Sequence, residues 1–176
     1  ANNEQDYQQQ LEKLAQGELL FHDIDNDGEV SKSEYILKEV GSYNNYLNDD
    51  EAFQAIMYSY VMFNIIDSGM EDSIDDDSLT RNEFEHLYIN LDKYQGLDET
   101  GTPVMSDPDG VLDIDSAGSF CFDIPNYYNA ELIEKALECY QNNDLETNNS
   151  DDADTKNAKT LARFCFKTLN IIKKYS

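Results

Sequence analysis

Apolar residues recur three or four positions apart in six stretches of the chain, and polar segments separate these stretches. Such spacing places the apolar side chains on one face of an α-helix, which can then pack against a neighbouring helix. The sequence therefore predicts an all-α fold. The expected helices cover residues 4–22, 31–40, 49–63, 82–94 and 129–140, and a last helix includes residues 161–172.

The stretch 95–128 has a different character. Seven glycine and proline residues interrupt it, and no long helical period survives. We expect turns in this stretch and a short strand over 111–114. The change divides the chain into a first part, residues 1–95, and a second part, residues 96–176, which is expected to be a second helical lobe.

The polar segment after the first expected helix carries an ordered pattern, D-x-D-x-D-G-x-V-S-x-x-E over residues 23–34. This pattern resembles the calcium-binding loop of the EF-hand family at every specified position. A polar surface turn before a capped helix is the alternative, because Ser31-x-x-Glu34 is also a capping-box pattern. That alternative does not account for three aspartates at alternating positions, whose charges repel one another in the absence of a cation.

The resemblance implies a set of ligands for Ca²⁺, which binds about six to eight oxygen atoms at about 2.3–2.6 Å. Side chains at the first, third, fifth, ninth and twelfth positions and the carbonyl of the seventh supply these oxygens. In this order around the loop, the expected ligands are Asp23, Asp25, Asp27, Glu29, Ser31 and Glu34. Gly28 stands where the loop turns sharply, and Val30 is expected in a short strand that pairs with a second loop.

A second helix–loop–helix of the same kind is expected around residues 67–83. Apolar residues of the third expected helix run into Asp67, and Leu79, Thr80 and Glu83 match the last part of the motif. The segment has seventeen residues, whereas the family motif has about twelve. We therefore expect an expanded loop, and Leu79 is the residue expected to pair with Val30.

Whether this expanded loop binds a second ion stays open. In the preferred interpretation it does, and in the alternative it is a vestigial loop without metal. The ligands expected in the preferred interpretation are Asp67, Asp75 or Asp77, and Glu83.

The second part of the chain carries two weaker fragments of the motif. Residues 107–113 match its middle, but Met105 and Ser116 then stand at its two ends, so a turn and a short strand are expected instead. Residues 142–154 are acidic, but Ala158 stands where a closing glutamate is expected, and a flexible linker is favoured. The four segments begin about forty residues apart, a spacing similar to that of calmodulin-like and sarcoplasmic calcium-binding proteins, here with a degenerate C-terminal half.

The chain contains 37 Asp and Glu residues against 12 Lys and Arg residues, and its formal net charge is −25. This charge disfavours nucleic acids and anionic membranes and favours cations and basic peptides. No stretch of the sequence is apolar enough to span a bilayer. The three cysteines have no metal-binding spacing and are expected to be reduced thiols, with one disulfide as the alternative in a secreted chain.

The leading interpretation is a calcium-binding protein that acts as a sensor or modulator and docks a protein or basic-peptide partner. A calcium buffer and a structural module that calcium only stabilises are the alternatives. No enzyme is expected, because His22 and His86 have ordinary structural explanations and no catalytic motif occurs. The oligomeric state stays open. So does the compartment: a cytoplasmic location is favoured, and a secreted or periplasmic one fits a leader removed before Ala1.

Overall fold

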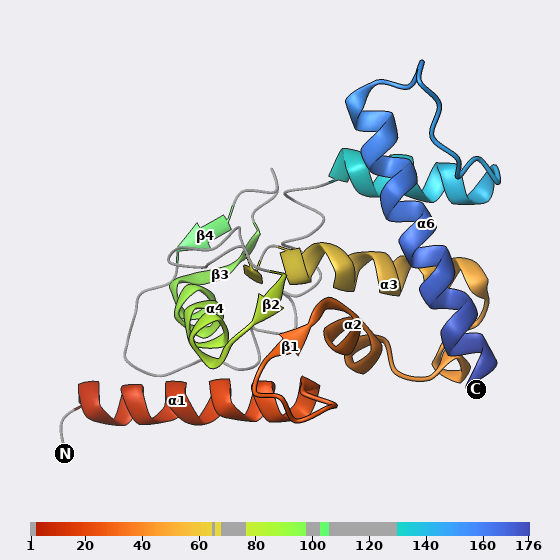
Figure 1. Ribbon diagram of the computed structural model, residues 1–176. Coiled ribbons are helices and arrows are strands. Elements are labelled where there is room, and N and C mark those ends of the chain that lie inside the picture. Colours follow the sequence, from red (N-terminus) through yellow and green to blue (C-terminus); the bar gives the residue numbers. More distant parts are fainter. Residues whose placement is uncertain (1–2, 65, 68–76, 98–102, 106–129) are drawn as a thin grey trace.

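The structure is a computed structural model and describes residues 3–64, 66–67, 77–97, 103–105 and 130–176. Most of these residues are helical, as the hydrophobic pattern predicts (Figure 1). The helices are α1 (Asn3–His22), α2 (Lys32–Val40), the 3₁₀ helix η1 (Tyr43–Asn45), α3 (Asp49–Asn64), α4 (Arg81–Lys93), a helix over 130–141 and α6 (Ala153–Lys174). The strands are β1 (Val30–Ser31), β2 (Ser78–Leu79), β3 (Tyr94–Leu97) and β4 (Pro103–Met105).

Capping residues mark the ends of the helices. Ser31 Oγ accepts a hydrogen bond from the Glu34 N–H at 3.2 Å, and Glu34 Oε1 accepts one from the Ser31 N–H at 2.9 Å. Together these two bonds form the capping box that the sequence predicts at the start of α2. Gly41 ends α2 with a φ of 69°, a conformation that strains most side chains. The capping box indicated by the sequence is confirmed.

Three elements, η1, β3 and β4, are not predicted by the hydrophobic pattern. η1 lies within the polar connector 42–48, and β3 pairs with β4 in an antiparallel hairpin. Met105 lies opposite Tyr94 in this hairpin. Such short strands carry too few residues for their alternation to stand out in the sequence. The strand predicted over 111–114 and the rest of the third calcium-loop fragment lie outside the described residues.

A short antiparallel bridge joins the two loops of the first part. In this bridge Val30 of β1 lies opposite Leu79 of β2, and both side chains are fully buried. The predicted pairing of these two residues is confirmed. Around the bridge, α1 packs against α4 and α2 packs against α3, so β1 of the first loop and β2 of the second lie side by side (Figure 1).

The second part of the chain packs directly on α3. The ring of Tyr60 lies edge-on to Phe164 of α6 with 4.9 Å between centroids, and Phe53 stacks on Tyr140 with 4.1 Å between centroids. One hydrophobic cluster therefore runs through the described residues from α1 to α6. The division of the chain at residue 95 stays a prediction. Within the described part of the chain, no helix is long and apolar enough to cross a membrane.

Candidate metal centre

The first loop leaves α1 after His22 and enters β1 at Val30. Two of its residues have positive φ angles, Asn26 with 59° and Gly28 with 88°. This left-handed conformation reverses the chain direction, and glycine adopts it without the steric cost that a Cβ atom adds. The reversal lets carboxylates from both sides of the bend meet.

Four carboxylates meet inside this bend. One oxygen each from Asp23, Asp25, Asp27 and Glu34 lies within 4.8 Å of the others. Asp23 is buried, whereas the other three side chains are reached by solvent. Hard divalent cations such as Ca²⁺ and Mg²⁺ bind oxygen ligands of this kind. The four residues could therefore hold a metal ion.

Backbone N–H groups donate hydrogen bonds to all four carboxylates, and the bonds to Asp23 and Glu34 span the loop. Asp23 accepts hydrogen bonds at Oδ2 from the Gly28 N–H at 2.9 Å and at Oδ1 from the Asp27 N–H at 3.2 Å. Glu34 Oε2 accepts a hydrogen bond from the Ile24 N–H at 2.7 Å. Glu34, on the first turn of α2, is thereby tied to the start of the loop, so the loop closes around its own carboxylates.

The four carboxylates differ in their electrostatics. Burial raises the pKa of Asp23, but hydrogen bonds from the Gly28 N–H and neighbouring groups outweigh burial and hold this pKa below its usual value. Backbone hydrogen bonds lower the pKa of Glu34 against burial in the same way. The pKa of Asp25 is raised, by burial first and then by Asp23 and Asp27. A bound cation favours the charged form of all these groups.

Glu29 and Ser31 are the two other ligands predicted in the first loop. The predicted ligand atom of Glu29 is its carbonyl oxygen, and its carboxylate accepts a hydrogen bond from Ser78 Oγ of the second loop at 3.0 Å. Ser31 Oγ accepts the capping hydrogen bond of α2. The side chain of Glu29 thus links the two loops, and that of Ser31 caps α2. Both residues lie in the sequence between Asp27 and Glu34 of the carboxylate cluster.

The second loop is built differently. Asp67 and Glu83 are both buried, with 1% and 4% of their surfaces exposed, and Asp67 Oδ2 accepts a hydrogen bond from the Asp77 N–H at 2.8 Å. The Asp77 carboxylate is exposed, and its Oδ1 lies 3.7 Å from Lys32 Nζ. Asp75 lies outside the described residues. Among the residues that are described, this loop has no group of three carboxylates as close together as those of the first loop.

A second cluster of titratable side chains lies next to the first loop and consists of Glu18, His22 and Glu39. His22 is fully buried, with Nδ1 2.7 Å from the Glu18 carbonyl oxygen and Nε2 3.0 Å from Glu39 Oε1. Its ring stacks with the rings of Tyr35 and Phe84. Burial alone lowers the pKa of His22, but its hydrogen bonds to Glu39 and Glu18 outweigh burial and raise it. As an imidazolium, His22 donates both hydrogen bonds and ties α1 to α2.

A lysine forms ion pairs with two aspartates of the acidic segment between the helix over 130–141 and α6. Lys159 of α6 is 2% exposed, and its Nζ lies 2.9 Å from Asp151 Oδ2 and 3.3 Å from Asp144 Oδ1. One turn later, Arg163 donates a hydrogen bond to the Leu145 carbonyl oxygen at 2.6 Å. An ammonium group thus supplies the positive charge that a cation supplies in a metal-binding loop.

This arrangement differs from the flexible linker expected over 142–154. The spacing of the motif points to Ala158 as the closing position, whereas Lys159, the next residue, makes the ion pairs. A basic residue directly after an acidic segment is the signal that could have identified the closure. Its pairing with Asp144 and Asp151 depends on how α6 packs, which the local sequence does not reveal.

Comparisons with known proteins identify no relative of this chain. No protein-family model matches it, and neither the curated proteins nor the solved structures give a match. The resemblance of the first loop to the EF-hand motif therefore rests on its residues and their geometry.

Proposed function

We propose that this protein binds calcium through its first loop, in a helix–loop–helix of the EF-hand kind. The observation that carries the proposal is the convergence of oxygens from Asp23, Asp25, Asp27 and Glu34 within 4.8 Å. The order of these residues and the turn at Gly28 fit the way in which such a loop surrounds Ca²⁺. The remaining expected ligands are the carbonyl oxygen of Glu29 and the side chain of Ser31, the latter directly or through a water molecule.

We further propose that the first and second loops form an EF-hand pair. The bridge between Val30 and Leu79 and the side-by-side loops support this arrangement. A second ion in the expanded loop would use Asp67, Asp75 or Asp77, and Glu83. The burial of Asp67 and Glu83 at its two ends favours such a site, but Asp77 can contribute its carboxylate only by leaving Lys32.

In its cellular role the protein is proposed to be a calcium sensor or modulator that docks a protein partner rather than an enzyme. The formal net charge of −25 favours a basic segment as that partner. The competing roles are a calcium buffer and a structural module in which calcium stabilises the fold. A sensor changes the apolar surface it offers to partners when calcium binds, whereas a structural module keeps this surface unchanged.

The test is a calorimetric calcium titration of the full chain in millimolar magnesium, with two variants of the same loop. Glu34→Gln removes a ligand oxygen and is expected to weaken calcium binding by more than about tenfold. Glu29→Gln removes the same charge from the loop but keeps the carbonyl ligand, so a change of about threefold at most is expected. Absence of calcium binding by the folded wild-type chain, or equal losses in both variants, would refute the site.

The number of binding events separates the one-ion and two-ion forms. Two events in the wild-type chain, of which Glu83→Gln removes one, would establish the second site. A single event that Glu83→Gln leaves in place would identify the second loop as vestigial. A dissociation constant of about 10⁻⁷–10⁻⁵ M is expected for an intracellular sensor, and one of about 10⁻⁴–10⁻³ M for an extracellular module.

A further inference from the structure

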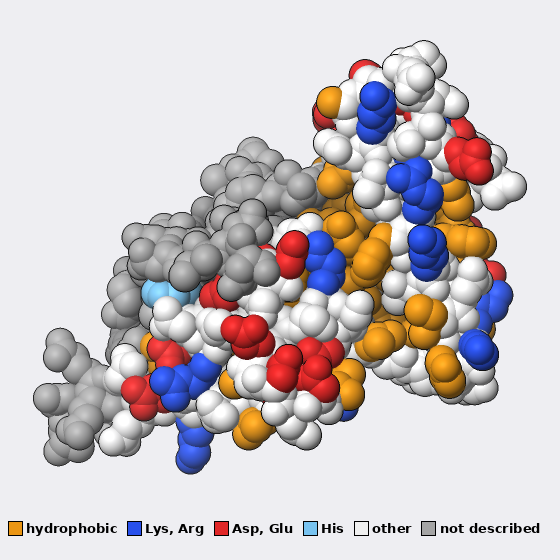
Figure 2. All heavy atoms as spheres, in the orientation of Figure 1, with side chains coloured by type: hydrophobic (Ala, Val, Ile, Leu, Met, Phe, Trp, Pro, Cys, Tyr) orange, Lys and Arg blue, Asp and Glu red, His pale blue; other side chains and the backbone are white. Residues whose placement is uncertain are grey.

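Basic residues are concentrated in one helix of this acidic chain. α6 contains a single acidic residue, Asp154, and half of the 12 Lys and Arg residues of the chain. Outside α6, six basic residues therefore face 36 acidic ones. The basic residues of α6 are Lys156, Lys159, Arg163, Lys167, Lys173 and Lys174. α6 is thus a basic amphipathic helix packed on a strongly acidic body, and Figure 2 shows its basic side chains along its length.

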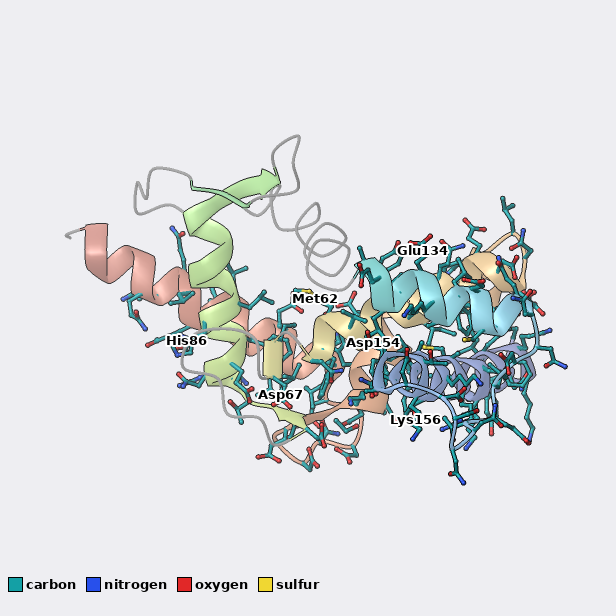
Figure 3. The ribbon with its side chains drawn as sticks, turned by 90° about the horizontal axis from the view of Figure 1, so that it is seen from above. Met62, Asp67, His86, Glu134, Asp154 and Lys156 are labelled. Carbon is teal, nitrogen blue, oxygen red and sulfur yellow. The ribbon has the colours of Figure 1, made fainter. Side chains whose placement is uncertain are left out.

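The two halves of α6 are held differently. The first half is fixed to its own preceding loop by Lys159, which is almost fully buried between Asp144 and Asp151. The second half, from Phe164 onward, carries ring and ion-pair contacts with α3 and η1 of the first part of the chain. Figure 3 shows the first half of α6 beside the helix over 130–141.

The second half of α6 makes apolar contacts and one ionic contact with this surface. Leu169 and Ile172 are buried, and Phe164 meets the ring of Tyr60. Near the end of the helix, Lys173 Nζ lies 3.0 Å from Asp49 Oδ2 and 5.6 Å from the centre of the Tyr43 ring. We call the part of α3 and η1 that carries Tyr43, Asp49 and Tyr60 the α3–η1 face.

The ion pair of Lys173 with Asp49 is weaker than the ion pairs of Lys159 with Asp144 and Asp151. The side chains of Lys173 and Asp49 are 42% and 41% exposed, and solvent-exposed ion pairs contribute little to stability. The Lys159 side chain is 3% exposed, so its ion pairs are shielded from solvent. Apolar side chains also remain visible along the seam between α6 and α3 (Figure 2). The ionic part of the cost of leaving the surface is therefore lower for the second half of α6 than for the first half.

We propose that the α3–η1 face is a docking surface for a basic amphipathic helix of a partner protein, and that residues 164–174 occupy it as an intramolecular competitor. The chemistry of the partner follows from that of the present occupant: apolar residues at the spacing of Phe164, Leu169 and Ile172, followed by a lysine that reaches Asp49. This inference rests on the partner-docking part of the proposed function. It does not require that the first loop binds calcium.

The probe is a peptide with the sequence of residues 161–176 and the single change Phe166→Trp. The full chain contains no tryptophan, so all tryptophan emission and anisotropy report on the peptide. Leu169→Ala and Ile172→Ala in the full chain loosen its own α6 and are expected to tighten peptide binding at least fivefold over the wild-type chain. Ile171→Ala is the matched control because Ile171 is 47% exposed between the same turns, and it is expected to leave the affinity unchanged.

A charge reversal tests the ionic contact separately. It is made in the Leu169→Ala chain, whose own α6 is already loosened, because Asp49→Lys in the wild-type chain would also weaken the hold of the chain's own Lys173. In this background Asp49→Lys is expected to weaken binding of the peptide, and a peptide that also carries Lys173→Glu is expected to restore it. Equal affinities for the Leu169→Ala, Ile172→Ala and Ile171→Ala chains would overturn the proposal. If the alanine variants prove unfolded by circular dichroism, hydrogen exchange of the wild-type chain decides: residues 164–174 are expected to exchange faster than 155–163, and exchange of both halves in one step would overturn the proposal.

Each titration is repeated with calcium and with a chelator. The variants could show the expected changes in peptide affinity while the wild-type chain gives no calorimetric signal with calcium. That result would support the docking surface and refute the proposed calcium site. A calorimetric signal with calcium, together with no peptide binding by any variant, would support the calcium site and refute the docking surface. The two proposals can thus fail separately.

Discussion

Val30 of the first loop and Leu79 of the second face each other across a two-residue antiparallel bridge, and neither side chain is exposed. The bridge is the only direct strand pairing between the two loops in the described residues. We therefore expect a change on one side of the bridge to affect the other loop.

Leu79→Ala is expected to destabilise the protein by about 2–5 kcal/mol, because a buried leucine loses its contacts and leaves a cavity. Urea unfolding followed by circular dichroism measures this loss. Leu47→Ala is the control, since Leu47 is 92% exposed, and its effect on unfolding is expected to be negligible. In the calcium titration, Leu79→Ala is also expected to weaken binding at the first loop, although Leu79 is not a ligand. An unchanged affinity would mean that the loops act independently.

Asp25→Asn is expected to have opposite effects with and without calcium. The raised pKa of Asp25 means that its negative charge is less favourable in the folded state than in the unfolded state. Removing this charge is therefore expected to raise the thermal midpoint in a chelator at neutral pH and to weaken calcium binding. Thermal unfolding in a chelator and calorimetry in calcium measure the two effects. A lower midpoint in both conditions would contradict the idea that the carboxylates repel one another.

The contribution of His22 to stability is expected to depend on pH. Its pKa is raised in the folded protein, so its stabilising effect is complete below the unfolded value of about 6.5 and disappears as the pH rises through the folded value. In a chelator, the difference in unfolding free energy between the wild-type chain and His22→Gln is expected to shrink as the pH rises above neutrality. Glu39→Gln removes the acceptor at Nε2 and is expected to flatten the same profile. A difference that grows with pH would show that His22 is neutral in the folded state.

Lys159→Met is expected to lower the thermal midpoint by several degrees, because Asp144 and Asp151 then lose the ammonium group between them. Lys156→Met is the matched control, since Lys156 is exposed on the preceding turn of α6. Lys159→Met is expected to leave the calcium affinity of the first loop unchanged. Equal midpoints for the two variants would show that the closure of the segment does not depend on Lys159.

Much of the first part of the chain could be predicted from the sequence because its signals are local. The carboxylates, Gly28 and the Ser31–Glu34 capping box lie within twelve consecutive residues, and hydrogen bonds inside this segment create their geometry. The Val30–Leu79 pairing spans the gap between two loops, yet each residue occupies the same position of its motif. Repeated motifs therefore carried information about a long-range contact.

Other features depend on packing that no local pattern encodes. The Lys159 closure requires α6 to lie against the acidic segment, and the contact between Lys32 and Asp77 joins different loops. Similarly, the apolar face of α6 predicts that the helix is buried but not that it crosses α3. Periodicity identifies which side of a helix is covered, whereas the identity of its neighbour follows from the whole fold.

The packing of α6 on α3 also has a consequence for biosynthesis. Ribosomes add about 5–20 residues per second, so several seconds separate the completion of α3 from that of α6. During this interval Phe164 does not yet exist, and the ring of Tyr60 lacks the partner that later meets it. An uncovered apolar face on a nascent chain invites aggregation. The dense negative charge of the chain makes such incomplete molecules repel one another, so this charge is expected to oppose aggregation while the protein is being made.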